Sequence, residues 1–301
     1  MLIIGSHVNF REEQLLGCVK DIINYGGNTF MFYTGAPQNS IRRTIDDSLT
    51  IEAYHLMKEH NILLDKVVCH APYIINLANN SDPLKYQFGQ DFLRKEIDRC
   101  NLLGVKYLVL HPGSAVKCER NAALFNIIKG LNRVLTKNDN IVILLETMAG
   151  KGTELGINIH ELKTIIDNIT YQDKIGVCLD TCHLNDSGVD IKTFDLYLDQ
   201  FDEKIGLDKI KCIHINDSKN EVGMHKDRHA NLGFGTIGFD TLIDVIYNER
   251  LEAIPKILET PYVDDKPPYK HEIKMIKNKK FNPNLIEEIR LDDTKKIFSY
   301  K

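Results

Sequence analysis

Short apolar runs alternate with longer amphipathic segments along almost the whole chain. Most of these runs are continuously apolar, which is typical of parallel strands that are buried on both faces. Eight strands are predicted, at residues 2–4, 29–32, 66–69, 107–110, 141–145, 176–179, 212–215 and 256–258. Successive strand and helix units in this number favour a (β/α)8 TIM barrel, an α/β fold with its functional site at the carboxyl ends of the strands.

The helices between the strands carry start signals of their own. Asp82 followed by Pro83 is typical of a helix N-cap with proline in the first helical position. Asn158 stands three residues before Glu161, the spacing of a capping box, and a helical stripe of apolar residues follows. We interpret such stripes as core positions.

No linker rich in Gly, Pro or Ser divides the chain, and no low-complexity tract occurs. A single barrel domain is therefore predicted over residues 1–280. Residues 281–301 are predicted to be a C-terminal extension whose last helix packs on the barrel.

Composition limits the possible partners. The formal net charge of -4 excludes a broad cationic surface, so contact with a nucleic acid must come from a local patch and bound cations. The seven cysteines form no CxxC pair, and several lie inside apolar runs, which favours buried thiols in a reducing cytoplasm. No apolar run approaches the length of a membrane span, so no membrane association is expected.

The candidate chemistry lies at or just past the predicted strand ends. Five histidines and four carboxylates occupy such positions: His70, His111, Glu146, Asp180, His183, His214, Asp227, His229 and Glu259. Because the carboxyl ends of parallel strands meet at one mouth of a barrel, these side chains are expected to share one site. Glu146 and Asp180 each close an apolar strand, where a carboxylate must be paired or bound to metal. For Asp227 and His229, which lie in a glycine-bounded loop, a metal site and a solvated loop both remain open.

The ligand types indicate the metal and the reaction. Five imidazoles without a thiolate favour zinc over magnesium, with manganese or iron as alternatives at one site. Clustered metals activate water and hold both oxygens of a phosphoryl centre, so phosphoester hydrolysis is the predicted reaction class. The predicted helices carry other histidines, which we interpret as surface residues.

Seven segments in the same order resemble the successive signatures of the endonuclease IV family. They are His70-Ala-Pro-Tyr73-Ile-Ile-Asn76-Leu, His111-Pro-Gly-Ser114, Leu145-Glu146-Thr-Met-Ala-Gly-Lys-Gly152, Asp180-Thr-Cys-His183, His214-Ile-Asn-Asp-Ser218, Asp227-Arg-His229-Ala-Asn-Leu-Gly233 and Glu259-Thr-Pro261. The resemblance runs from Gly5-Ser-His7 to about residue 280. It implies a deoxyribonuclease IV of base excision repair, which hydrolyses DNA on the 5′ side of abasic sites. The implied products are a 3′-hydroxyl and a 5′-deoxyribose phosphate.

The resemblance also implies roles for the candidate residues. It implies a trinuclear zinc centre in which Glu146 bridges two metals. One of these two metals would be completed by His70 and His111. The other would be completed by Asp180, His214 and Glu259, and the third metal would be held by His183, Asp227 and His229. Glu146 and Glu259 are the implied catalytic residues, because they would orient the attacking hydroxide.

The partner implied by the resemblance is double-stranded DNA containing an abasic site, bound by a monomer. Gln38, Tyr73 and Arg228 are the candidate DNA contacts, and Tyr73 and Gln38 match positions that wedge the duplex open. Asn39 departs from the arginine of some members, and Arg42 or Arg43 is a candidate to replace it.

Two other functions remain open from the residues. A metal-dependent sugar isomerase or epimerase of related barrel fold would rely chiefly on carboxylates and two metals, unlike this histidine-rich set. A metal-stabilised DNA-binding barrel without catalysis would be expected to lack a bridging or orienting carboxylate, whereas Glu146 and Glu259 are both present.

Overall fold

The computed structural model describes residues 1–292, and its centre is a closed barrel of eight parallel strands. The strands are β1 (Ile4–His7), β2 (Thr29–Phe32), β3 (Val68–His70), β4 (Tyr107–Leu110), β5 (Val142–Glu146), β6 (Ile175–Asp180), β7 (Ile210–Ile215) and β10 (Lys256–Leu258). They are hydrogen-bonded in the order β1-β10-β7-β6-β5-β4-β3-β2, and β2 pairs with β1 to close the ring. The predicted (β/α)8 barrel is therefore confirmed.

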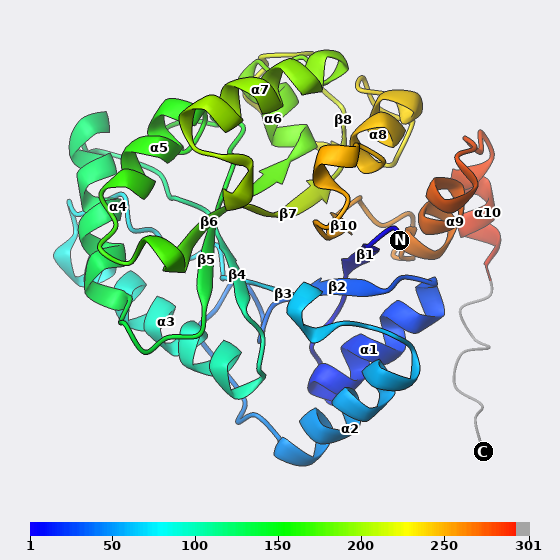
Figure 1. The fold of residues 1–301 in the computed structure, drawn as a ribbon, viewed down its shortest axis with the longest axis horizontal. Coiled ribbons are helices and arrows are strands. Elements are labelled where there is room, and N and C mark those ends of the chain that lie inside the picture. The colour runs from blue at the N-terminus through cyan, green and yellow to red at the C-terminus, as the bar shows by residue number, and fades with distance from the viewer. Residues whose placement is uncertain (293–301) are drawn as a thin grey trace.

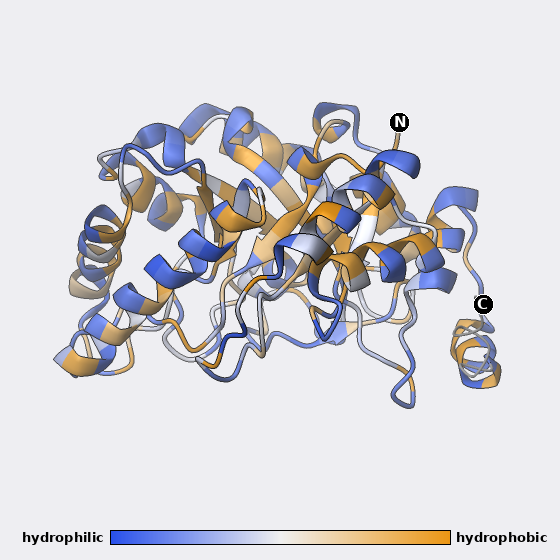
Figure 2. Ribbon diagram, turned by 90° about the horizontal axis from the view of Figure 1, so that it is seen from below, coloured by the Kyte–Doolittle hydropathy of each residue, from blue (hydrophilic) through white to orange (hydrophobic). Residues whose placement is uncertain are grey.

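Helices surround this barrel (Figure 1). They are α1 (Gln14–Tyr25), α2 (Asp47–Glu59), α3 (Pro83–Leu102), α4 (Arg120–Val134), α5 (Ile159–Asp167), α6 (Thr181–Ser187), α7 (Phe194–Lys204), α8 (Phe239–Ile246), α9 (Tyr269–Asn278) and α10 (Leu285–Leu291). Apolar segments gather on the strands and on the inward sides of the helices, and polar segments lie outside (Figure 2). Among residues 1–292, none of the helices combines the length and the apolar character needed to span a bilayer.

Two apolar layers explain why the strands read as continuous hydrophobic runs. One layer fills the barrel interior and consists of Met31, Val68, Val109, Val142, Leu144, Cys178, Cys212 and Ile257. The larger layer lies between the strands and the surrounding helices. Because both faces of each strand are buried, alternation between polar and apolar residues would leave polar groups in one core.

The first strand was placed too early by the apolar pattern. Residues 2–4 were predicted, but β1 extends from Ile4 to His7. Ser6 pairs with Leu258 and His7 with Met31, so the backbone ladder continues through two polar residues. These ladder hydrogen bonds depend on neighbouring strands rather than on the hydropathy of β1 itself.

The predicted helix starts are largely observed. Asp82 accepts hydrogen bonds from the amides of Leu84 and Lys85 at the start of α3. Asn158 accepts from the amide of Glu161 at 3.0 Å. Glu161 itself does not complete a capping box, because its carboxylate accepts from the amide of Gly156 and pairs with Arg120.

The segment after residue 280 begins on the barrel surface. Phe281 lies against Phe234 and Phe239, with ring centroids 5.4 and 5.7 Å away. Leu285 and Ile289 are the buried residues of α10, which packs on α9. Residues 293–301 of the predicted extension lie outside the described residues.

A buried lysine at the start of β10 offers a test of barrel stability. Lys256 is only 1 % exposed, and its ammonium donates to the carbonyl of Leu251 at 2.6 Å. Burial lowers the pKa of Lys256 to about 8, whereas an unfolded lysine has a pKa of about 10.4. Between these two pKa values the unfolded chain binds more protons than the folded chain, so stability rises with pH across this range. The charged lysine therefore destabilises the fold most below about pH 8.

We expect Lys256→Met to raise the free energy of unfolding by about 1–3 kcal/mol at pH 7. The gain should shrink toward pH 10, where the native lysine loses its charge in the fold. Urea unfolding at both pH values measures this, and an equal gain at both would show that the charge is not the cause.

Candidate metal centre

The nine candidate ligands converge on the mouth formed by the carboxyl ends of the strands. His70, Glu146 and Asp180 are the last residues of β3, β5 and β6. His214 is the penultimate residue of β7, and His111 and Glu259 directly follow β4 and β10. The three others, His183, Asp227 and His229, come from α6 and from the segment after β7. Each side chain therefore owes its place to a strand end or to a segment anchored beside one.

Glu146 lies at the centre of the cluster. Its Oε2 atom is 3.1 Å from His70 Nε2 and 3.0 Å from His111 Nε2. Its Oε1 atom is 3.1 Å from His214 Nδ1 and 3.2 Å from His183 Nδ1. The two carboxylate oxygens thus face different pairs of imidazoles, so this carboxylate could contribute to more than one cation.

A second group of ligands surrounds His214. Its Nδ1 atom is 3.0 Å from Glu259 Oε2 and 3.8 Å from Asp180 Oδ2. The side chain of Asn216 contacts both carboxylate residues. Its Nδ2 atom donates to Asp180 Oδ2 at 2.8 Å, and its Oδ1 atom accepts from the backbone amide of Glu259 at 3.1 Å. Glu146, Asp180, His214 and Glu259 together form a four-residue set suited to a metal ion.

A third group joins α6 to the segment that follows β7. His183 Nε2 is 3.1 Å from Asp227 Oδ1, and His229 Nε2 is 3.5 Å from the same oxygen. Backbone pairing between β8 (Asp217–Ser218) and β9 (His229–Ala230) sets His229 in place, with Ser218 opposite it. Asp180 also approaches this group, at 3.9 Å from His229 Nε2.

Charge complementarity holds the cluster together. Burial opposes ionisation of Glu146, but His214 and His111 outweigh it and hold the pKa of that carboxyl well below its usual range. Burial likewise opposes protonation of His183, but Asp180, Asp227 and Glu146 raise the pKa of His183 well above its ordinary value. Positive charge is therefore strongly favoured between these carboxylates.

The donor set fits zinc. His70 Nδ1 donates to the carbonyl of Ala71 at 2.8 Å, which leaves Nε2 free to bind a metal, the usual arrangement of a histidine ligand. His229 Nε2 is buried without a hydrogen-bond partner, although it faces Asp180 and Asp227. A shared cation between these three groups would satisfy the orphaned nitrogen.

His7, the last residue of β1, was not among the nine candidate ligands. The ring of His7 lies 5.3 Å from that of Tyr33, which in turn lies 4.9 Å from His70. Burial lowers the pKa of His7 to about 4, so a neutral imidazole lies beside the cluster. Its position at a strand end was the available signal, which the misplaced first strand concealed.

The candidate DNA contacts lie outside the metal cluster. Gln38 and Arg228 are exposed, and Tyr73 is 54 % exposed in the turn after His70. Arg42 does not replace the missing arginine at Asn39, because its buried guanidinium pairs with Glu96 at 2.6 Å and donates to carbonyls of its own loop. Arg42 therefore has a structural role in this protein.

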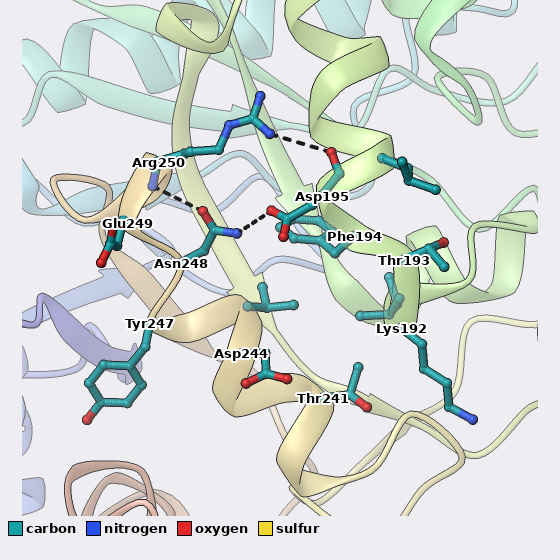
Figure 3. A pocket seen from close by; sticks show the side chains of 13 residues that line it. Lys192, Thr193, Phe194, Asp195, Thr241, Asp244, Tyr247, Asn248, Glu249 and Arg250 are labelled. Carbon is teal, nitrogen blue, oxygen red and sulfur yellow. Dashed lines mark hydrogen bonds between the residues drawn. The ribbon is translucent and has the colours of Figure 1, made fainter.

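A separate pocket lies on the outside of the barrel, between α7 and α8 (Figure 3). Two of its charged groups already have partners, since Asp195 accepts from Asn248 and Arg250 pairs with Asp199 at 2.8 Å. None of the nine candidate ligands lines it. We therefore place the chemistry at the strand ends and not in this pocket.

This chain resembles known proteins over most of its length. Residues 19–279 match the family model described as xylose isomerase-like TIM barrel. A protein named probable endonuclease 4 from Bacillus subtilis (strain 168) is 50 % identical over 296 residues, covering 96 % of this chain and 99 % of the relative. The protein of the same name from Mesoplasma florum is 51 % identical over 286 residues, covering 93 % of this chain and 97 % of the relative.

Solved structures show the same relationship. The crystal structure of endonuclease IV from Thermus thermophilus superposes with a TM-score of 0.77 at 27 % identity, covering 95 % of this chain and 99 % of that one. A D-tagatose 3-epimerase-like protein shares the fold, with a TM-score of 0.67 at 17 % identity and coverage of 95 % and 98 %. The chain therefore belongs to the endonuclease IV family and is a nuclease, a phosphodiester hydrolase of DNA repair built on a TIM barrel.

Proposed function

We propose that this protein hydrolyses the phosphodiester on the 5′ side of an abasic site and leaves a 3′-hydroxyl and a 5′-deoxyribose phosphate. We propose further that it uses about three zinc ions per chain. The observation that carries the proposal is the position of Glu146, whose two oxygens lie 3.0–3.2 Å from four imidazoles. One carboxylate thereby joins three groups of ligands.

The assignment of ligands follows the three groups. His70 and His111 with Glu146 would hold one ion, and Asp180, His214 and Glu259 with Glu146 would hold another. His183, Asp227 and His229 would hold the third, with Asp180 close by. Manganese or iron remains an alternative to zinc at one site, because imidazole and carboxylate ligands suit all three metals.

The protein's own side chains supply the orientation. Bound zinc would lower the pKa of water and neutralise charge on the phosphoryl oxygens and the departing 3′ oxygen. Glu259 lies 3.0 Å from His214, so its carboxylate is held at the edge of the cluster, where it can orient the attacking water. Glu146 is buried between the imidazoles and shares this role from the other side. Both carboxylates therefore act as catalytic residues of the proposed reaction.

Recognition of the lesion must be local, because the net charge of -4 gives no general attraction to DNA. The exposed ring of Tyr73 can stack into a gap in the duplex, with Gln38 and Arg228 as polar contacts. An abasic site lacks a base pair, so opening the helix there costs less than elsewhere. We propose that the protein acts in this way as a cytoplasmic monomer.

A paired assay with abasic and undamaged duplexes of the same sequence tests the function. We expect cleavage only of the abasic duplex, and binding to it at least about tenfold tighter at the same salt concentration. Tyr73→Ala should weaken binding to the abasic duplex by about tenfold, since loss of stacking costs about 1–3 kcal/mol. Its zinc content should be unchanged, because Tyr73 is no candidate ligand.

The products should carry a 3′-hydroxyl that a DNA polymerase can extend directly. Equal affinity of the native protein for both duplexes, without cleavage of either, would contradict the proposal. That result would favour a sugar epimerase, which the same preparation can be assayed for with ketohexoses.

A further inference from the structure

Asp186 is a fully buried carboxylate outside the nine candidate ligands. It lies on α6, the short helix that begins after Asp180 and carries His183. Residues three apart on a helix share a face, so Asp180, His183 and Asp186 follow one another along one side of this segment. The first two reach the metal cluster, and the third reaches the segment that carries Asp227.

Four donors occupy the two oxygens of Asp186. Oδ2 accepts from the backbone amide of Asp227 at 2.8 Å and from Asn220 Nδ2 at 2.7 Å. Oδ1 accepts from Ser218 Oγ at 2.7 Å and from Asn185 Nδ2 at 3.2 Å. Because these neutral donors already satisfy both oxygens, Asp186 is better suited to hold the backbone than to bind a metal.

The segment it holds has an unfavourable backbone conformation. Asp227 has a φ of 54° and His225 a φ of 53°, both in the left-handed region without being glycine. Such residues cost about 1–3 kcal/mol each and persist only where their surroundings hold them. Both are tied to the same residue, since the amide of His225 donates to the carbonyl of Asp186 at 2.9 Å.

A second buried carboxylate anchors the chain beyond His229. Asp217 accepts hydrogen bonds from the amides of Gly233, Gly235 and Ile237, each at 3.0 Å. Within residues 1–292 it makes no hydrogen bond to Asp227, whose backbone amide donates to Asp186 instead. Asp186 thus binds the segment before His229, and Asp217 binds the segment after it.

We propose that Asp186 is a positioning residue for the third metal site, which it assembles by fixing the backbone of Asp227 against His183. The proposal rests on the third site of the proposed function. The other two ligand groups come mainly from barrel strands and do not depend on this contact. Loss of Asp186 should therefore empty one site and leave the other two filled.

The test measures zinc per chain in Asp186→Ala and Asp186→Asn by elemental analysis of protein prepared without chelator. We expect about three ions in the native protein and about two in Asp186→Ala. Cleavage should fall by about 100-fold or more through kcat, with KM for the abasic duplex changed less than about threefold. Asp186→Asn should lie between the two, because its remaining oxygen can still accept from the amide of Asp227.

A second readout needs neither metal nor activity. Lys226 and Arg228 flank Asp227 and are exposed, so trypsin can cut this segment when it loosens. In metal-free protein, Asp186→Ala should be cut here at least about tenfold faster than the native chain, because the strained segment has lost its anchor. Asp186→Asn should be cut at an intermediate rate.

Two control variants separate positioning from general destabilisation. Ser218→Ala removes a donor to Asp186 Oδ1 and leaves the Asp227 contact. Asp139→Asn removes the charge of a remote buried carboxylate and so weakens its ion pair with Arg94, which lies 2.9 Å away. Both should keep about three zinc ions and at least about half of the native rate.

Two results would overturn the inference. One is an Asp186→Ala protein with three ions, native kcat and native trypsin resistance. The other is equal metal loss in Asp186→Ala and Asp139→Asn. If Asp186→Ala does not fold, Asp186→Asn decides by the same two measurements. If native protein binds no zinc and cleaves no abasic duplex, the proposed function itself has failed, whereas the trypsin result still judges the anchoring role.

Discussion

Replacing Glu259 with glutamine should lower the rate of abasic-site cleavage by about three orders of magnitude while the barrel stays folded. Glu259 Oε2 lies 3.0 Å from His214 Nδ1, and the backbone amide of Glu259 is held by Asn216 at 3.1 Å. Glutamine keeps the volume and the backbone contact but removes the negative charge. It therefore lacks what is needed both to bind a cation and to orient the attacking water.

Single-turnover cleavage of an abasic duplex measures the effect, and thermal melting checks the fold. Glu161→Gln is a matched control, because it makes the same change in a buried carboxylate that pairs with Arg120. The control should stay within about threefold of the native rate. A native rate in Glu259→Gln with unchanged melting would show that this carboxylate is only structural.

Removing the metals should abolish cleavage, by about three orders of magnitude or more, and adding zinc should restore it. Without cations, Glu146, Asp180, Asp227 and Glu259 share a small buried region, and only protonated imidazoles can balance them. The metal-free protein should therefore also melt at a lower temperature, because ions that bind only the folded chain stabilise it.

Elemental analysis before and after chelation counts the ions, with about three zinc expected before. Magnesium is the control, since it binds imidazole poorly and should restore little activity. A native content of zero or about one ion would contradict the trinuclear centre. Full activity after complete chelation would contradict metal-dependent hydrolysis altogether.

The apolar runs were enough to predict the barrel, because each run is buried on both faces and ends where the chain turns toward a helix. Thr29–Phe32, Tyr107–Leu110 and Lys256–Leu258 have the predicted bounds. The same logic located the candidate ligands. Glu146 and Asp180 are charged residues directly after apolar runs, and parallel strands bring such ends to one mouth whatever their separation in the chain.

Partners distant in sequence could not be inferred in this way. The polar end of β1, and with it His7, depends on pairing with β2 and β10. Arg42 resembled a DNA contact until the fold placed it against Glu96, 54 residues away. Asp186 was not among the candidate residues, yet its carboxylate accepts from the amide of Asp227, 41 residues further on.

The difference has a physical basis. Hydrophobic periodicity and strand ends are properties of a few consecutive residues, so the sequence by itself determined the barrel and the side of it on which the ligands gather. The partner of a buried polar group is whichever donor or acceptor the chain brings within about 3 Å, because leaving such a group unpaired is costly. Only the tertiary structure decided those pairings, and with them which charged residues face the metals and which hold the loops.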